Sequence, residues 1–314
     1  MTVKPEAGYQ VADTVAKNWV NRLAPQWARP YCQLSRLDRP IGIWLLLIPC
    51  WWSLGLAQMA TRGGLPDPWL LMLFAVGAVA MRGAGCTYND IIDRNLDAHV
   101  ARTRSRPIPS GRVSVCRSIA FMITLSLIGL IVLVQFNRLT IALALGSLIP
   151  VAIYPFMKRI THWPQIFLGL TFNWGALLGW TAVLGRLDWP AVALYAAGVA
   201  WTLGYDTIYA FQDREDDAIV GIKSTALRFG ANARVWLTIF YTAAIIGFAL
   251  AGAMVEAGVI FWLGLGVGSA HMAWQLLTLD TGEPERCLAL FRSNRDFGLI
   301  MAVAVMLEAL RASL

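Results

Sequence analysis

Residues 69–97 read WLLMLFAVGAVAMRGAGCTYNDIIDRNLD, an apolar run that ends in a cluster of carboxylate and amide side chains. A helix through the apolar part is long enough to cross the roughly 30 Å hydrocarbon core of a bilayer. The acidic end is unusual for this chain, because only 14% of its residues are charged, whereas an average soluble domain carries about 25%. Carboxylates at the end of a membrane helix predict a metal or phosphate site.

Apolar runs of similar length recur along the 314 residues, of which 57% are hydrophobic. This composition indicates a polytopic membrane protein, and glycine and proline inside the runs are tolerated by membrane helices. The predicted fold class is therefore an all-α membrane bundle of about nine transmembrane helices. The candidate spans are residues 41–60, 69–90, 117–135, 139–156, 164–184, 189–210, 234–254, 257–279 and 296–312.

Basic residues gather in alternate loops between these spans. The loops rich in them contain Arg94, Arg102, Arg104, Arg106 and Arg112; Lys158 and Arg159; Arg214, Lys223 and Arg228; and Arg286, Arg292 and Arg295. The other loops hold at most one basic residue each, namely Arg62, Arg138 or Arg186. The positive-inside rule then places the amino terminus and both acidic motifs on the cytoplasmic side. The net charge of +7 needs no nucleic-acid partner to explain it.

The cysteines and the amino-terminal residues bear on the domain organisation and on the cellular compartment of the protein. The five cysteines lack C-x-x-C spacing, so neither a disulfide framework nor a zinc site is predicted. Residues 1–35 are predicted to form an amphipathic cytoplasmic arm that lies on the membrane through Trp19, Leu23 and Trp27, and residues 36–314 the transmembrane domain. The arm lacks an Arg- and Ser-rich presequence, which favours a bacterial inner (plasma) membrane over a mitochondrial inner membrane.

Two acidic motifs provide the candidate metal ligands. On a helix, side chains four residues apart drift by only about 40° and share one face. Five oxygen-bearing side chains at two helix ends are suited to Mg2+ that bridges a diphosphate. The alternative for any single aspartate is an ordinary solvated loop. The five side chains are Asn89, Asp93 and Asp97 in the first motif and Asp213 and Asp217 in the second.

Arg82 is the candidate for an anion contact inside the membrane. It lies seven residues before Asn89, which is two helical turns or roughly 10 Å deeper on nearly the same face. An arginine in an apolar helix costs on the order of 2.5 to 3.5 kcal/mol on insertion scales, so Arg82 is expected to face a polar cavity. The alternative is a structural ion pair with another helix.

Other polar residues at predicted helix ends are phosphate or substrate candidates, each with a simpler alternative. Tyr154 and Lys158 stand four residues apart, although a lysine at the interface commonly snorkels. Arg36, before the first span, fits topogenic anchoring and phosphate contact equally well. Tyr209 precedes Asp213 by four residues and is a further candidate for substrate binding, with a lipid-facing aromatic belt as its alternative.

With these residues in view, the chain strongly resembles the UbiA family of intramembrane prenyltransferases. The matching segments are residues 36–42, 89–97, 102–109, 154–165, 172–175 and 205–226. The acidic motifs are specific to the superfamily, whereas residues 154–165 and 172–175 indicate the branch that acts on hydroxybenzoate. The resemblance implies a nine-helix bundle with a cytoplasm-facing polar cavity.

The resemblance also implies roles by matching position. Asn89, Asp93, Asp97, Asp213 and Asp217 would hold Mg2+ and through it the diphosphate. Arg36, Lys158 and Lys223 would contact the phosphates directly. Arg82 and Tyr154 would lie nearer to the aromatic acceptor or the reacting carbon, and the chemistry would depend most on Asp93, Asp213, Arg82 and Tyr154.

The implied activity is the Mg2+-dependent transfer of a polyprenyl chain from polyprenyl diphosphate to the carbon ortho to the hydroxyl of 4-hydroxybenzoate, in ubiquinone biosynthesis. The expected partners of the protein are these two substrates and the lipid bilayer, which holds the prenyl tail. One alternative is the same chemistry on haem, homogentisate, a naphthoate or a chlorophyllide. Another is a secondary transporter, but that class expects charged groups near the membrane midplane in both halves of the chain.

Overall fold

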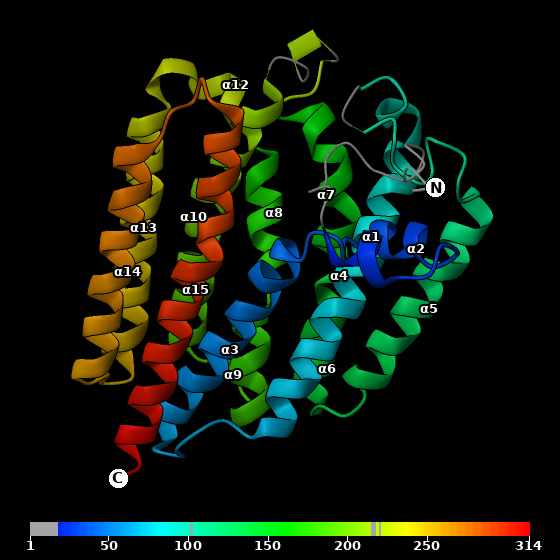
Figure 1. The fold of residues 1–314 in the computed structure, drawn as a ribbon. Coiled ribbons are helices and arrows are strands. Elements are labelled where there is room, and N and C mark those ends of the chain that lie inside the picture. Colours follow the sequence, from blue (N-terminus) through cyan, green and yellow to red (C-terminus); the bar gives the residue numbers. More distant parts are fainter. Residues whose placement is uncertain (1–17, 101–102, 215–217, 220) are drawn as a thin grey trace, which may run out of the picture. The chain divides into compact units, whose positions relative to one another are not determined.

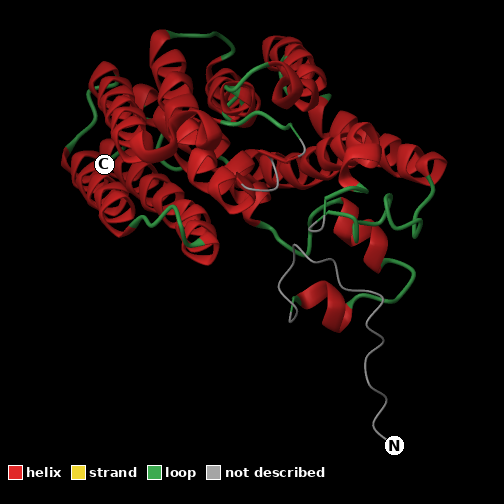
Figure 2. Cartoon of the chain, turned by 90° about the horizontal axis from the view of Figure 1, so that it is seen from above, coloured by secondary structure: helices red, strands yellow, loops and turns green. Residues whose placement is uncertain are grey.

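The computed structural model describes residues 18–100, 103–214, 218–219 and 221–314. The described residues form helices joined by turns and loops, with no strand among them (Figures 1 and 2), which confirms the predicted all-α class. The helices are α1 (Trp19–Leu23), α2 (Arg29–Leu34), α3 (Ile41–Thr61), α4 (Pro68–Asp97), α5 (Val115–Leu133), α6 (Arg138–Gly146), α7 (Leu148–Ile160), α8 (Pro164–Phe172), α9 (Gly175–Leu184), α10 (Trp189–Ala210), η1 (Phe211–Asp213), α12 (Thr225–Phe229), η2 (Gly230–Asn232), α13 (Ala233–Met254), α14 (Val259–Thr278) and α15 (Pro284–Ala312).

The protein is an integral membrane protein. Among the described residues, seven helical stretches are long and apolar enough to cross a bilayer: Ile41–Thr61, Pro68–Asp97, Val115–Leu133, Arg138–Ile160, Pro164–Leu184, Thr225–Met254 and Val259–Thr278. The predicted spans 189–210 and 296–312 correspond to α10 and α15, which form as long helices but are not among those seven. The count of nine spans therefore stays a prediction.

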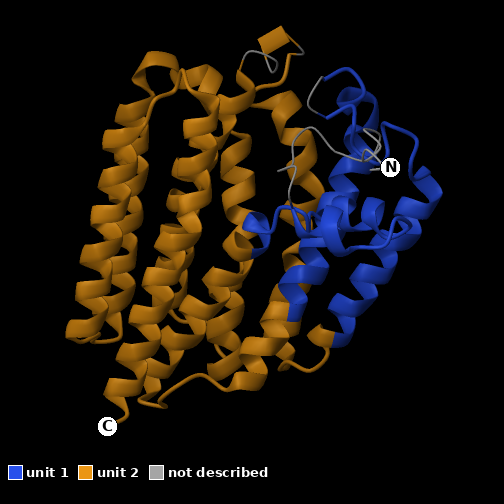
Figure 3. Cartoon of the chain, viewed as in Figure 1, with its two compact units in different colours: residues 1–43, 76–131 blue, residues 44–75, 132–314 orange. Residues whose placement is uncertain are grey.

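The chain divides into two compact units (Figure 3). Unit 1 contains residues 1–43 and 76–131, and unit 2 contains residues 44–75 and 132–314. This division differs from the predicted boundary at residue 35, because α1 and α2 belong to the same unit as the end of α4 and most of α5. The separate cytoplasmic arm stays a prediction.

In unit 1, small residues bring α4 and α5 together. A Cβ atom on Gly83 would come within 2.7 Å of Leu125, and one on Gly129 within 2.5 Å of Met81, so the two helices approach as closely as small residues allow in a membrane bundle. Before α3, the Trp19 indole donates to the Leu37 carbonyl at 2.7 Å. Trp19, Leu23 and Trp27 are 46%, 79% and 77% exposed, and their contact with the membrane stays a prediction.

In unit 2, α10 packs against α8, α13 and α15, and α14 packs against α13 and α15. Figure 1 shows α13, α14 and α15 running side by side. The core of this bundle is a cluster of aromatic rings from four helices that are at most 1% exposed: Trp52, Trp201, Phe248 and Phe297. Apolar rings on inward faces explain why these helices associate.

Hydrogen bonds gather several basic loops of unit 2 at one end of its helices. The Lys223 amide donates to the Lys158 carbonyl at 2.8 Å, which joins the residues before α12 to the last turn of α7. The Arg234 guanidinium donates to the Leu279 carbonyl at 3.0 Å, which joins the start of α13 to the end of α14.

Candidate active site

The first acidic motif forms the last turns of α4. The Asn89 amide donates to a carboxylate oxygen of Asp93 at 3.1 Å, as the four-residue spacing predicts. Asp93 is fully buried and Asn89 is half-buried. A buried carboxylate needs compensating partners, and Asn89 supplies one of them.

Asp97 has a different environment from the other two predicted ligands. Its carboxylate accepts from the Arg106 guanidinium at 2.9 Å, and Arg106 lies 3.3 Å from Asp90. Asp90 and Asp97 are seven residues apart, so their directions on the helix differ by only about 20°. Asp97 therefore points in nearly the same direction as Asp90, whereas the four-residue spacing groups it with Asn89 and Asp93.

Arg36 contacts the same carboxylate. Its guanidinium donates to Asp90 at 2.6 Å and to the Gln33 carbonyl at 2.8 Å. Its predicted role as a phosphate contact stays a prediction. The ion pairs that Asp90 and Arg106 form were not predicted from the sequence, although both residues lie in segments that match the family. The seven-residue spacing between Asp90 and Asp97 was the available signal.

Packing explains why Arg106 reaches these carboxylates. In the loop after α4, Ile108 and Val113 form a small buried core with Leu34. The Thr103 hydroxyl donates to the Asp97 carbonyl at 2.9 Å. The loop is thereby fixed at both ends against unit 1, and Arg106 lies between these anchors.

Arg82 is half-buried on α4 and lies beside the first turn of α3. A Cβ atom on Gly42 would come within 2.7 Å of both Nε and Nη2 of Arg82. Glycine at position 42 therefore leaves the space that the guanidinium occupies. The first turn of a helix carries a partial positive charge, so Arg82 and α3 together favour an anion at this place.

The predicted phosphate contacts of unit 2 lie together. Lys158 is in the last turn of α7, and its carbonyl accepts from the Lys223 amide. The Lys223 ammonium donates to the Ile160 carbonyl at 3.0 Å, a position where the partial negative charge of a helix end stabilises a cation. Tyr154 lies one turn before Lys158 and is half-buried.

The second acidic motif follows α10. This helix ends at Ala210, and Phe211–Asp213 continue as a tighter 3-10 turn. The spacing from Tyr209 to Asp213 is therefore not the regular α-helical one that the sequence pattern assumes. The Tyr209 ring packs on Phe291 with centroids 4.5 Å apart. Asp213 is half-buried, and Asp217 lies outside the described residues.

The predicted residues thus form one group in each unit. Arg36, Arg82, Asn89, Asp93 and Asp97 belong to unit 1, and Tyr154, Lys158, Tyr209, Asp213 and Lys223 belong to unit 2. The convergence of both acidic motifs on one ligand stays a prediction. Among the described residues, no three His, Cys, Asp or Glu side chains form a ready metal-binding group.

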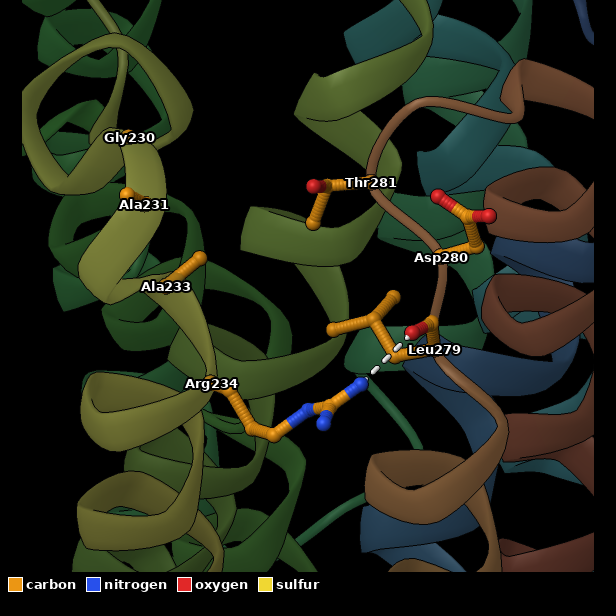
Figure 4. Close-up of a pocket in the computed structure, with 7 residues that line it drawn as sticks. All are labelled: Gly230, Ala231, Ala233, Arg234, Leu279, Asp280 and Thr281. Atoms are coloured by element: carbon orange, nitrogen blue, oxygen red, sulfur yellow. Dashed lines mark hydrogen bonds between the residues drawn. The ribbon is translucent and has the colours of Figure 1, made fainter.

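A pocket of about 500 Å³ opens at a different place in unit 2 (Figure 4). It is lined by Gly230, Ala231, Ala233, Arg234, Leu279, Asp280 and Thr281. None of the predicted site residues that the structure describes is among them. The Arg234 guanidinium crosses toward the Leu279 carbonyl, so this arginine ties α13 to the end of α14.

Comparison with solved structures shows the fold. The chain matches a UbiA homolog from Aeropyrum pernix with a TM-score of 0.68 and 24% identity, covering 82% of this chain and 97% of that one. It matches a UbiA homolog from Archaeoglobus fulgidus bound to GPP and Mg2+ with a TM-score of 0.59 and 19% identity, covering 90% and 99% of the two chains.

Comparison with curated sequences shows much higher identity. The chain is 50% identical over 282 residues to the mitochondrial 4-hydroxybenzoate polyprenyltransferase of Aedes aegypti, covering 90% of this chain and 64% of that protein. It is 50% identical over 286 residues to the protein of the same name from Bos taurus, covering 90% and 76%. A sequence pattern of the UbiA prenyltransferase family matches residues 46–301. The chain therefore belongs to the UbiA prenyltransferase family.

Proposed function

We propose that this protein transfers a polyprenyl chain from polyprenyl diphosphate to the ring carbon ortho to the hydroxyl of 4-hydroxybenzoate. The observation that carries the proposal is the 50% identity, over 90% of the chain, to insect and mammalian proteins named for this activity. These proteins are longer than this chain, which spans 64% and 76% of them. The family supports a prenyltransferase over the alternative of a transporter.

The proposal includes a divalent metal, with Mg2+ as the natural ion. The donors offered by the two motifs are carboxylate and amide oxygens, which Mg2+ prefers, and this ion usually keeps waters and substrate phosphates among its ligands. The pair formed by Asn89 and Asp93 at the end of α4 brings one amide and one carboxylate of this donor set together. Asn89, Asp93, Asp97, Asp213 and Asp217 are the proposed ligands, and the solved homolog from Archaeoglobus fulgidus is described with Mg2+.

The reaction breaks the allylic C–O bond, forms a bond to the ring carbon and releases the ring proton. When bound, the metal stabilises the negative charge that develops on the departing diphosphate. Lys158, Lys223 and Arg36 supply fixed positive charge for the same anion. Tyr154 is proposed to lie by the reacting carbon and Tyr209 to contact substrate. The proton goes to diphosphate or to a carboxylate of the motifs, while surrounding apolar helices exclude the water that would hydrolyse the allylic cation.

The acceptor distinguishes this proposal from its alternatives. Purified protein in proteoliposomes would be given geranyl diphosphate, Mg2+ and a panel of 4-hydroxybenzoate, homogentisate, a naphthoate, haem and a chlorophyllide. We expect a single prenylated product, from 4-hydroxybenzoate, identified by mass spectrometry. A product from another acceptor alone would assign a sibling activity. Solute exchange across the vesicles with no product from any acceptor would favour a transporter.

Arg82 is proposed to bind the carboxylate of 4-hydroxybenzoate, and Gly42 offers a test of that role. In Gly42→Ala the new Cβ would overlap the guanidinium and displace it. A charge-assisted hydrogen bond contributes about 1.5 to 3 kcal/mol, so we expect the KM for 4-hydroxybenzoate to rise roughly tenfold or more. The KM for the prenyl diphosphate should stay within about twofold of the wild-type value, since the hydrogen bond from Arg82 is proposed to bind the acceptor and not the diphosphate.

Gly266→Ala is the matched control, because a Cβ at this helical glycine would meet nothing within 4 Å. It should leave both KM values unchanged. A rise in the KM for the prenyl diphosphate instead of the acceptor would assign Arg82 to the diphosphate.

The proposed location is a bacterial inner membrane with the active site on the cytoplasmic side, although the relatives described above are named as mitochondrial. Cys116 tests the sidedness, because it is an exposed free thiol next to the basic loop before α5. A membrane-impermeant maleimide should label Cys116 in inverted membrane vesicles and not in intact spheroplasts. A Cys32→Ser background removes the half-buried thiol that could add to the signal. Labelling from the outside would reverse the proposed orientation.

A further inference from the structure

A chain of alternating charges runs through the site residues of unit 1. The Arg36 guanidinium lies 2.6 Å from Oδ1 of Asp90, and the Arg106 guanidinium lies 3.3 Å from the same oxygen. Arg106 also lies 2.9 Å from Asp97. Asp90 is fully buried, so this single carboxylate oxygen is the point at which both arginines meet away from water.

Asp90 is part of the acidic motif but is in a poor position to bind a cation. Its direction on α4 is about 100° from that of its neighbour Asn89, which pairs instead with Asp93. A cation that approached the shared oxygen of Asp90 would meet two guanidinium groups, and like charges at such distances repel strongly in a buried environment. The role of Asp90 therefore differs from that of Asn89 and Asp93, which pair with each other.

Arg36 holds its place in a backbone conformation that glycine adopts more easily. Arg36 follows α2 and has a φ of 59°, in the left-handed region that glycine adopts most easily. The Leu37 amide donates to the Cys32 carbonyl at 2.9 Å, a pattern that ends the helix and fixes this conformation. A non-glycine residue in such a conformation carries strain, which commonly accompanies a functional side chain.

Arg106 is held on a similarly fixed backbone. Its loop is anchored through the Thr103 hydroxyl to the end of α4 and through Ile108 to the small core with Leu34. Both arginine backbones are therefore fixed independently of Asp90. The contribution of Asp90 is to set the direction in which the two guanidinium groups point.

We propose that Asp90 is a positioning residue that acts through Arg36 and Arg106, holding both guanidinium groups beside the acidic end of α4 so that they receive the diphosphate. This inference rests on the proposed function for the identity of the anion. With Asp97 proposed to hold the metal, Asp90 would remain the carboxylate that keeps the Arg106 guanidinium in place. Asp90 itself binds neither the metal nor the substrate.

The test is binding of Mn2+ to the purified protein, followed by the EPR signal of free Mn2+, and binding of radiolabelled inorganic pyrophosphate in the presence of Mn2+, followed by equilibrium dialysis. Asp90→Asn keeps the volume and one acceptor oxygen and removes the charge. We expect Mn2+ affinity without pyrophosphate to stay within about twofold of the wild type, and pyrophosphate affinity in the presence of Mn2+ to fall by about tenfold, since residues that orient a binding shell typically contribute 10- to 100-fold.

Asp296→Asn is the matched control, because Asp296 is 48% exposed and pairs with its neighbour Arg295. It should change neither affinity. Loss of Mn2+ binding without pyrophosphate in Asp90→Asn would make Asp90 a metal ligand and overturn the proposal. An unchanged pyrophosphate affinity in that variant would overturn it as well.

Arg106→Gln keeps the test decisive if Asp90→Asn does not fold, as judged by thermal unfolding. This variant should also lose about tenfold in pyrophosphate affinity while it retains Mn2+ binding. If both variants fold, the double variant should lose much less than the product of the two single effects, because Asp90 acts in part through Arg106. Fully multiplicative effects, or no effect of Arg106→Gln, would contradict the proposal. A wild-type protein that binds neither Mn2+ nor pyrophosphate would instead overturn the proposed function.

Discussion

Replacement of Asp93 by alanine is expected to abolish prenyl transfer while the protein remains folded and inserted in the membrane. Asp93 is a fully buried carboxylate at the centre of the first motif, and it accepts a hydrogen bond from Asn89. Metal stabilisation of a leaving group supplies several kcal/mol, and each factor of ten in rate is about 1.4 kcal/mol, so the loss should be roughly a thousandfold or more. The rate of product formation from 4-hydroxybenzoate and geranyl diphosphate measures it.

Asp213→Ala should cause a loss of the same order, because the second motif is proposed to serve the same diphosphate. Asp296→Ala, at an exposed aspartate outside both motifs, should retain full activity and control for general effects of removing a carboxylate. Full activity of Asp93→Ala and Asp213→Ala in membranes supplied with Mg2+ would remove both motifs from the catalytic account.

Removal of divalent ions is expected to stop turnover completely. The departing diphosphate carries the charge that develops in the reaction, and lysine and arginine side chains alone replace only part of the stabilisation that a divalent ion gives. Treatment with EDTA should bring product formation to the background level, and excess Mg2+ should restore it. Turnover that continues unchanged in EDTA would contradict the role of the metal.

The helical architecture follows from sequence patterns that act locally. The apolar run 69–90 and the motif 89–97 merge into one helix, α4 (Pro68–Asp97), because an apolar segment in a bilayer must satisfy its backbone hydrogen bonds internally. The pairing of Asn89 with Asp93 follows from the four-residue spacing alone. The polar cavity expected around Arg82 stays a prediction.

Other features depend on contacts between distant segments. The bond from Arg36 to Asp90 spans 54 residues and requires the left-handed turn after α2, which no local signal indicated. The pairing of Arg106 with Asp97 depends on how the loop packs through Ile108 and Val113. The 3-10 turn at Phe211–Asp213 likewise departs from the regular helix that spacing suggests. Helix counting is difficult at α15, because the first half of this 29-residue helix contains several charged residues.

The most direct test of the central claim is an experimental structure of this protein with Mg2+ and a non-cleavable geranyl thiolodiphosphate. The account predicts that oxygens of Asp93 and Asp213 bind ions about 2.1 Å away that both contact one diphosphate. A structure in which the bound diphosphate contacts ions held by only one of the two motifs, with the other motif too far away to reach it, would contradict the account.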